Sequence, residues 1–148
     1  ACIGAVVGLV AITPAAGFVN LGQSVFIGFA AAIVSNLAVY YKQRTSLDDT
    51  LDVFPCHGLG GIVGMILTAV FAKDVGLVNG ETQTFQYHML ALLIVGVFTF
   101  GGSYIIFKIT GAITRLRVSP NDEQLGLDLS QHGETMRTSK HQKVEVMA

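Results

Sequence analysis

The chain has 148 residues, of which 51% are hydrophobic and only 13% are charged, and its mean hydropathy is +0.59. A soluble domain carries about 25% charged residues, so the composition argues against an ordinary soluble fold. The net charge is −1 and no basic block is present, so nothing indicates a nucleic-acid partner. Ten of the nineteen Asp, Glu, Lys and Arg residues follow Ile113. We therefore predict that most of the chain before Ile113 lies in lipid.

The first apolar segment, Ala1–Ile12, is twelve residues long and stops at Thr13-Pro14. Proline disfavours helical backbone in the residue before it, which explains the stop. A helix needs about twenty residues to span a bilayer, so this segment is too short. No initiator Met or charged region precedes it. We expect the chain to open within a membrane helix and to be the C-terminal piece of a longer protein.

Three longer apolar segments follow, at about 20–41, 53–72 and 84–113. Each is long enough to span, and strands are excluded because open sheet edges cannot face lipid. The predicted fold is therefore all-α, a polytopic membrane helix bundle over residues 1–113. Small-residue pairs four apart allow close helix crossings within it, at Gly4 and Gly8, Gly28 and Ala32, and Gly60 and Gly64.

A polar tail, residues 114–148, follows the bundle. Ser119 and Pro120 with the acids after them predict the start of a short helix, which Gly126 would end. The last fourteen residues lack a helical stripe and are expected to be disordered. Positive residues concentrate in the 42–52 loop and after the last span, which predicts a cytoplasmic location for both.

His57 is the only ionisable side chain in the third segment apart from the Cys56 thiol. Such groups are costly in lipid and usually face a bundle interior or a cavity, so His57 is a functional candidate. On a regular helix it would share a face with small residues, namely Gly60, Gly61, Gly64 and Thr68. The alternative is a histidine bonded to a neighbouring helix without a transport role. A haem or zinc ligand is disfavoured because no second ligand stands at the required spacing.

Three acids precede the third segment, at Asp48, Asp49 and Asp52. We favour their role as a helix cap that complements the positive N-terminal dipole. The alternative is a cation-attracting mouth on the cytoplasmic side.

Three sequence blocks together resemble the ammonium transporter (Amt/Mep/Rh) family, in its Amt branch. They are GLVAITPAAG at 8–17, DDxxDVFxxHGxxGxxG at 48–64, and a tail with LRV at 116–118, GLD at 126–128 and HGE at 132–134. The resemblance implies the last four of eleven transmembrane helices, the first of them truncated, with a cytoplasmic C-terminus in the plasma or inner membrane. It also implies a homotrimer with one hydrophobic pore per subunit.

By the same resemblance, ammonium loses a proton and neutral ammonia crosses past two stacked histidines. His57 matches the second of this pair, Val53 matches a position lining the inner pore, and Thr13 matches one near the pore. The first histidine, the aromatic recruitment site and the phenylalanine gate belong to earlier helices in the family. The 148 residues alone are therefore not expected to form the pore.

The tail of family members couples subunits and in many of them contacts a PII signalling protein. The patterned or regulatory positions of this tail are Arg117, Gly126, Asp128, Ser130 and Gly133. Ser130 lies where some plant members carry a phosphothreonine, although we favour an unmodified serine.

The predicted function is channel-type transport of ammonium or ammonia through the bilayer, without a cofactor or metal. Two alternatives stay open: an ammonium sensor that signals through its tail, and an Rh-like neutral gas channel. An enzyme is not predicted, because no nucleophile–base pair is evident in the sequence.

Overall fold

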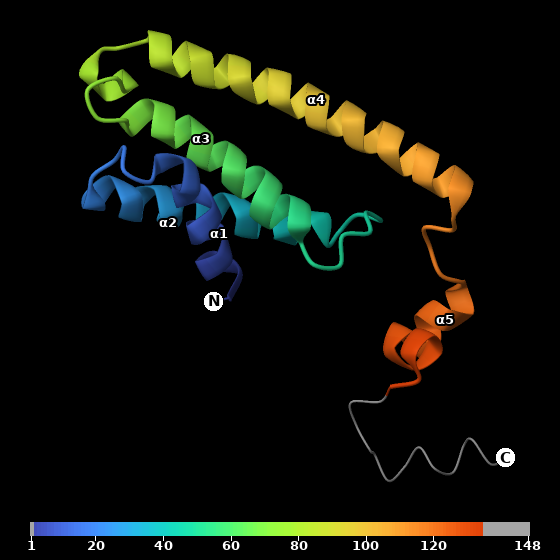
Figure 1. Ribbon diagram of the computed structural model, residues 1–148. Helices are drawn as coiled ribbons and strands as arrows, with labels where there is room; N and C mark the ends of the chain where they lie inside the picture. The colour runs from blue at the N-terminus through green and yellow to red at the C-terminus, as the bar shows by residue number, and fades with distance from the viewer. Residues whose placement is uncertain (1, 135–148) are drawn as a thin grey trace, which may run out of the picture. The chain divides into compact units, whose positions relative to one another are not determined.

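A computed structural model describes residues 2–134 of the chain. Every regular element in this range is helical, which confirms the predicted all-α bundle (Figure 1). The chain divides into two compact units, residues 1–99 and 100–148. The expected disorder of the last fourteen residues lies outside the described range.

The main α-helices are α1 (Cys2–Ile12), α2 (Leu21–Lys42), α3 (Gly60–Phe71) and α4 (Gln83–Ile113). A 3₁₀-turn, η1 (Thr13–Ala15), follows α1, and a π-helix, η2 (Phe54–Leu59), leads into α3. Another 3₁₀-turn, η3 (Leu77–Asn79), precedes α4. When η2 and α3 are taken as one segment, these bounds lie within one residue of the apolar segments expected from the sequence. The division into a membrane part and a cytoplasmic tail remains a prediction.

Small residues let α1 approach both α2 and α3 closely. A Cβ atom on Gly28 would lie 3.8 Å from the Cα of Gly8, and one on Gly4 would lie 4.0 Å from the Cβ of Ala32, so α1 and α2 are antiparallel. Helix α1 meets α3 as closely, since a Cβ on Gly64 would lie 2.3 Å from the Ala11 carbonyl oxygen. The predicted close crossings are confirmed at these contacts.

The core of this unit is formed by α1, α2 and the η2–α3 segment. Its buried residues are mostly small, which is how helices in lipid come close enough to pack; they are Val7, Ala11, Ala15, Ile27, Ala31 and Cys56. Helix α1 runs parallel to α3, because Val7 packs by Gly60 and Ala11 by Gly64. The end of the unit near η1 is tied by a hydrogen bond of 2.8 Å from the Lys73 N–H to the Phe18 carbonyl.

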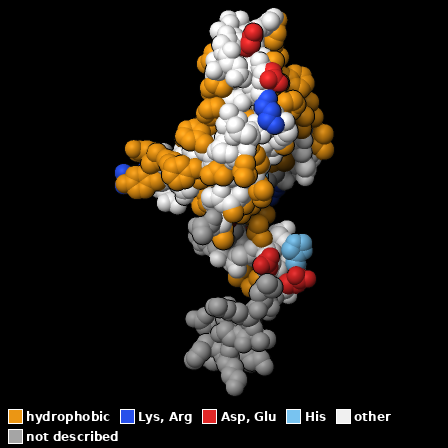
Figure 2. All heavy atoms as spheres, turned by 90° about the vertical axis from the view of Figure 1, so that its left-hand side faces the viewer, with side chains coloured by type: hydrophobic (Ala, Val, Ile, Leu, Met, Phe, Trp, Pro, Cys, Tyr) orange, Lys and Arg blue, Asp and Glu red, His pale blue; other side chains and the backbone are white. Residues whose placement is uncertain are grey.

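Within residues 2–134, three helical stretches are long and apolar enough to cross a bilayer: Leu21–Lys42, Phe54–Phe71 and Gln83–Ile113. A shorter apolar helix covers Cys2–Ala15. Large hydrophobic side chains lie exposed over much of the visible surface (Figure 2), as expected of helices that face lipid or other helices rather than water.

The tail begins with a short loop after α4 and forms two short helical turns. Helix α5 (Pro120–Leu125) starts at Ser119, whose hydroxyl oxygen accepts a hydrogen bond of 3.2 Å from the Asp122 N–H. It ends at Gly126, which adopts a positive φ of 94°. The predicted start and end of this helix are therefore confirmed. A second turn, η4 (Asp128–His132), follows.

Candidate functional site

The loop between α2 and η2 holds the start of the third segment through Asp49. The Asp49 carboxylate accepts hydrogen bonds from the N–H groups of Val53 (2.8 Å) and Phe54 (3.0 Å). These are among the N–H groups that a helix start leaves without an intrahelical partner. Asp49 therefore caps the segment that carries Val53 and His57.

The other two acids of the loop have different partners. The Asp52 carboxylate pairs with the Lys42 ammonium at 2.5 Å, across the loop. The Asp48 carboxylate accepts a longer hydrogen bond of 3.4 Å from the Thr50 hydroxyl. The side chain that caps the segment is thus that of Asp49, while Asp52 ties the start of η2 back to the end of α2.

His57 sits in the π-helix η2, and this changes which face it occupies. The buried row along the segment is Cys56, Gly60, Gly64 and Thr68, whereas His57 is exposed. The expectation that His57 shares the face of those small residues is therefore wrong. A π-turn contains more residues than an α-turn, so it rotates His57 away from the row and brings Cys56 onto it.

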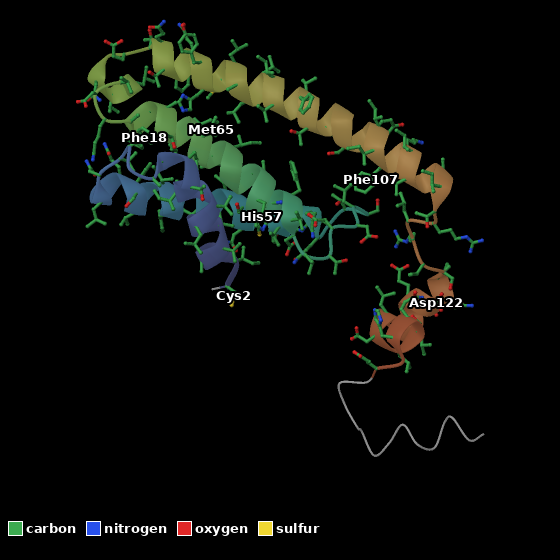
Figure 3. The ribbon with its side chains drawn as sticks, in the orientation of Figure 1. Cys2, Phe18, His57, Met65, Phe107 and Asp122 are labelled. Carbon is green, nitrogen blue, oxygen red and sulfur yellow. The ribbon has the colours of Figure 1, made fainter. Side chains whose placement is uncertain are left out.

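His57 faces a groove of about 720 Å³ at the loop end of α2 and η2. We call this the His57 groove, and it brings together four residues singled out in the sequence, namely Asp48, Asp49, Val53 and His57. The rest of its wall is mainly apolar, with Lys42 and Thr45 as polar exceptions; the apolar part includes Ala38, Phe54, Pro55 and Leu59. Figure 3 shows His57 toward the end of the bundle opposite Phe18.

Thr13 does not join the His57 groove. It lies in η1, beyond the level where Ala11 meets Gly64, and its hydroxyl donates a hydrogen bond of 2.7 Å to the Leu9 carbonyl of the preceding helix, α1. The structure therefore places Thr13 toward the other end of the bundle from His57.

The tail residues singled out in the sequence lie in or beside the two short helices α5 and η4. The Arg117 guanidinium pairs with the Glu123 carboxylate at 2.7 Å. The Ser130 hydroxyl donates to the Asp122 carbonyl at 3.4 Å, and the Asp128 carbonyl accepts from the Glu134 N–H at 2.9 Å. Gly126 and Gly133 both adopt positive φ, of 94° and 67°. Such backbone favours glycine, which explains these two residues at the ends of α5 and η4.

The family model described as the Ammonium Transporter Family matches residues 1–137. The chain belongs to the ammonium transporter family. Among its relatives are the ammonium transporters of Aquifex aeolicus, 42% identical over 88% of this chain and 32% of that protein, and of Bacillus subtilis, 40% identical over 88% of this chain and 34% of that protein. Ammonium transporter Amt1 of Archaeoglobus fulgidus is 37% identical over 91% of this chain and 36% of its own length.

The chain spans about a third of the length of these curated relatives. They are named as transporters rather than enzymes. Family membership and the long apolar helices together give the chain a membrane location.

Sequence reasoning missed two features of this family member's groove. One is the partnership of Lys42 with Asp52, ten residues apart, for which no local spacing rule exists. The other is the π-helix around His57. Pro55 offered a signal for an irregular turn there, because proline removes a backbone donor and crowds the preceding turn.

The Asp49 cap predicts a pH-dependent contribution to stability. The N–H groups of Val53 and Phe54 lower the pKa of the Asp49 carboxyl, and Lys42 adds a smaller effect in the same direction. A folded-state pKa below the unfolded value of about 3.9 means that the carboxylate stabilises the fold above that pH. This contribution is lost as the pH falls through the folded-state pKa.

We therefore expect Asp49→Ala to lower the apparent unfolding temperature of the detergent-solubilised protein at neutral pH. The difference from wild type should begin to shrink below about pH 4 and should be lost as the wild-type cap protonates at its lowered pKa. The control, Asp48→Ala, removes an equal charge from the same loop but leaves the Asp49 carboxylate, which accepts both hydrogen bonds, in place. An equal and pH-independent loss in the two variants would contradict the assignment.

Proposed function

We propose that the intact gene product conducts ammonium across a membrane, with neutral ammonia as the species that passes His57. The observation that carries this proposal is the placement of His57 and Val53 on one largely apolar groove of a chain in the ammonium transporter family. An imidazole is suited to this task because, when neutral, one ring nitrogen donates a hydrogen bond and the other accepts one.

The physical reason for shedding the proton is the cost of a bare cation in a medium of low dielectric constant. The ideal cost of moving a monovalent ion there is of order 20 kcal/mol. Ammonium can avoid that cost by releasing a proton, whereas potassium has no proton to release. An apolar passage lined by histidine therefore selects ammonium over potassium.

The finer features of the proposal rest on the family resemblance and on charge. His57 would be the second of two stacked histidines, with Val53 beside it and Thr13 nearer the other end. The protein would form a homotrimer in the plasma or inner membrane. The positive residues Lys42, Arg44, Lys108, Arg115 and Arg117 support a cytoplasmic location for the His57 groove and the tail. A PII-type signalling protein would then reach the turn containing Gly126, Asp128 and Gly133.

Expression of the intact gene product in a strain without ammonium transporters tests this function. We expect it to restore growth on low ammonium and to support uptake of isotopically labelled ammonium, with no matching uptake of potassium. If the protein reaches the membrane in normal amount but gives no uptake, the transport proposal fails. An ammonium-dependent cellular response without uptake would instead indicate the sensor.

A further inference from the structure

Lys42, the last residue of α2, contacts two parts of the loop that follows. Its ammonium pairs with the Asp52 carboxylate at 2.5 Å and also donates a hydrogen bond to the Asp49 backbone carbonyl. Both partners of the ion pair are largely withdrawn from solvent, with side chains 15% and 20% exposed. An ion pair so placed is screened less than one at an open surface.

These contacts hold the turn that starts η2. The Asp49 carbonyl also accepts a hydrogen bond of 3.1 Å from the Asp52 N–H, and the Asp52 carbonyl accepts one of 2.9 Å from the Cys56 N–H. Asp52 adopts a left-handed backbone with φ of 53°, a conformation that costs free energy in residues with a side chain, although aspartate adopts it more readily than most. Such a conformation persists where surrounding contacts hold it. Lys42 supplies one of those contacts through the Asp52 carboxylate.

This loop turn also positions two residues of the His57 groove, Val53 and His57. Asp49 caps the N–H groups of Val53 and Phe54, and the Asp52 carbonyl bonds Cys56, the residue before His57. Lys42 itself lies on the wall of the groove. A single side chain on α2 therefore ties together the loop, the cap and the first turn that carries His57.

We propose that Lys42 is a positioning residue of the His57 groove, which holds Val53 and His57 in place by bonding Asp49 and Asp52 across the loop. This inference rests on the proposed transport function and assigns Lys42 a part in it. The alternative is that Lys42 only contributes positive charge to the loop. Arg44 provides the comparison, because it carries the same charge two residues on but stacks on the Tyr40 ring, 4.0 Å from the ring centre.

The experiment measures labelled ammonium uptake by the intact gene product, reconstituted in vesicles at equal amounts of folded protein. For Lys42→Met we expect a maximal rate about tenfold lower, equivalent to about 1.4 kcal/mol on the barrier, with an unchanged half-saturating concentration. Lys42→Arg should restore most of the rate, because it keeps the charge and the donors. Arg44→Met should transport as wild type does.

Hydrogen exchange at the Val53 and Phe54 amides gives a readout independent of transport, and we expect it to accelerate in Lys42→Met but not in Arg44→Met. If Lys42→Met fails to accumulate, Asp52→Asn takes its place, since asparagine tolerates the left-handed backbone while removing the ion pair. It should show the same loss of maximal rate.

A wild-type rate in Lys42→Met or Asp52→Asn would overturn the inference, as would an equal loss in Arg44→Met. Unchanged amide exchange in Lys42→Met would overturn it as well. Absence of uptake by the wild-type protein would instead defeat the transport proposal, and the exchange measurement would still decide whether Lys42 holds the turn.

Discussion

Replacing His57 with leucine in the intact gene product is expected to lower ammonium uptake by tenfold or more, about 1.4 kcal/mol or more on the transport barrier. Leucine fills a similar space but can neither donate nor accept a hydrogen bond. A molecule leaving water for the largely apolar His57 groove then finds no polar partner at that position. The measurement is the initial rate of labelled ammonium uptake in vesicles, normalised to protein inserted.

His88→Leu is the matched control for this prediction. His88 lies in α4, and its Nδ1 is 2.9 Å from the Thr84 carbonyl one turn earlier, a contact within its own helix. We expect its uptake rate to stay near that of wild type. If the two leucine variants lose the same fraction of activity, or if His57→Leu loses none, the proposed role of His57 is refuted.

Gly64→Ala is expected to destabilise the bundle strongly, because the added methyl group has no room. Its Cβ would lie 2.3 Å from the carbonyl oxygen and 2.8 Å from the Cα of Ala11, and both atoms belong to the backbone of α1. Backbone atoms cannot move away by a rotamer change as side-chain atoms can, so α1 and α3 must separate. Overpacking of this kind costs about 1–3 kcal/mol and occasionally more. The apparent unfolding temperature in detergent should fall clearly.

The control for that substitution is Gly61→Ala, three residues earlier on α3. A Cβ there would meet only the Val10 side chain, at 4.0 Å, which is ordinary van der Waals contact. Alanine is also a better helix former than glycine, so stability should be unchanged or slightly higher. Equal unfolding temperatures for the two alanine variants would show that the α1–α3 contact is not as close as described.

Much of the fold depends on residues close together in the sequence and could therefore be predicted from it. The lengths of the apolar segments indicated the helices, because a residue's transfer into lipid depends mainly on its own side chain and its neighbours along the chain. The ends of α1 and α5 were equally predictable, since Pro14, Ser119 and Gly126 act within a few residues of their own positions. The family resemblance likewise rested on short blocks, and the family match over residues 1–137 confirmed it.

The geometry of the candidate site was only partly accessible from the sequence. That His57 is a costly ionisable group in an apolar segment follows from its surroundings in the chain. The helix face on which His57 lies could not be predicted, because the prediction assumed α-helical spacing where η2 makes a wider turn. The grouping of His57 and Val53 apart from Thr13 also required the packing of α1 against α3.

The sequence by itself thus determined that this protein is an all-α membrane bundle of the ammonium transporter family, and that His57 is the residue to test first. Only the tertiary structure decided that Cys56 rather than His57 joins the buried row, and that Lys42 reaches back to Asp49 and Asp52. The reason is physical. Hydropathy and capping act between near neighbours, whereas an ion pair across ten residues exists only once the loop has folded and brought its two ends together.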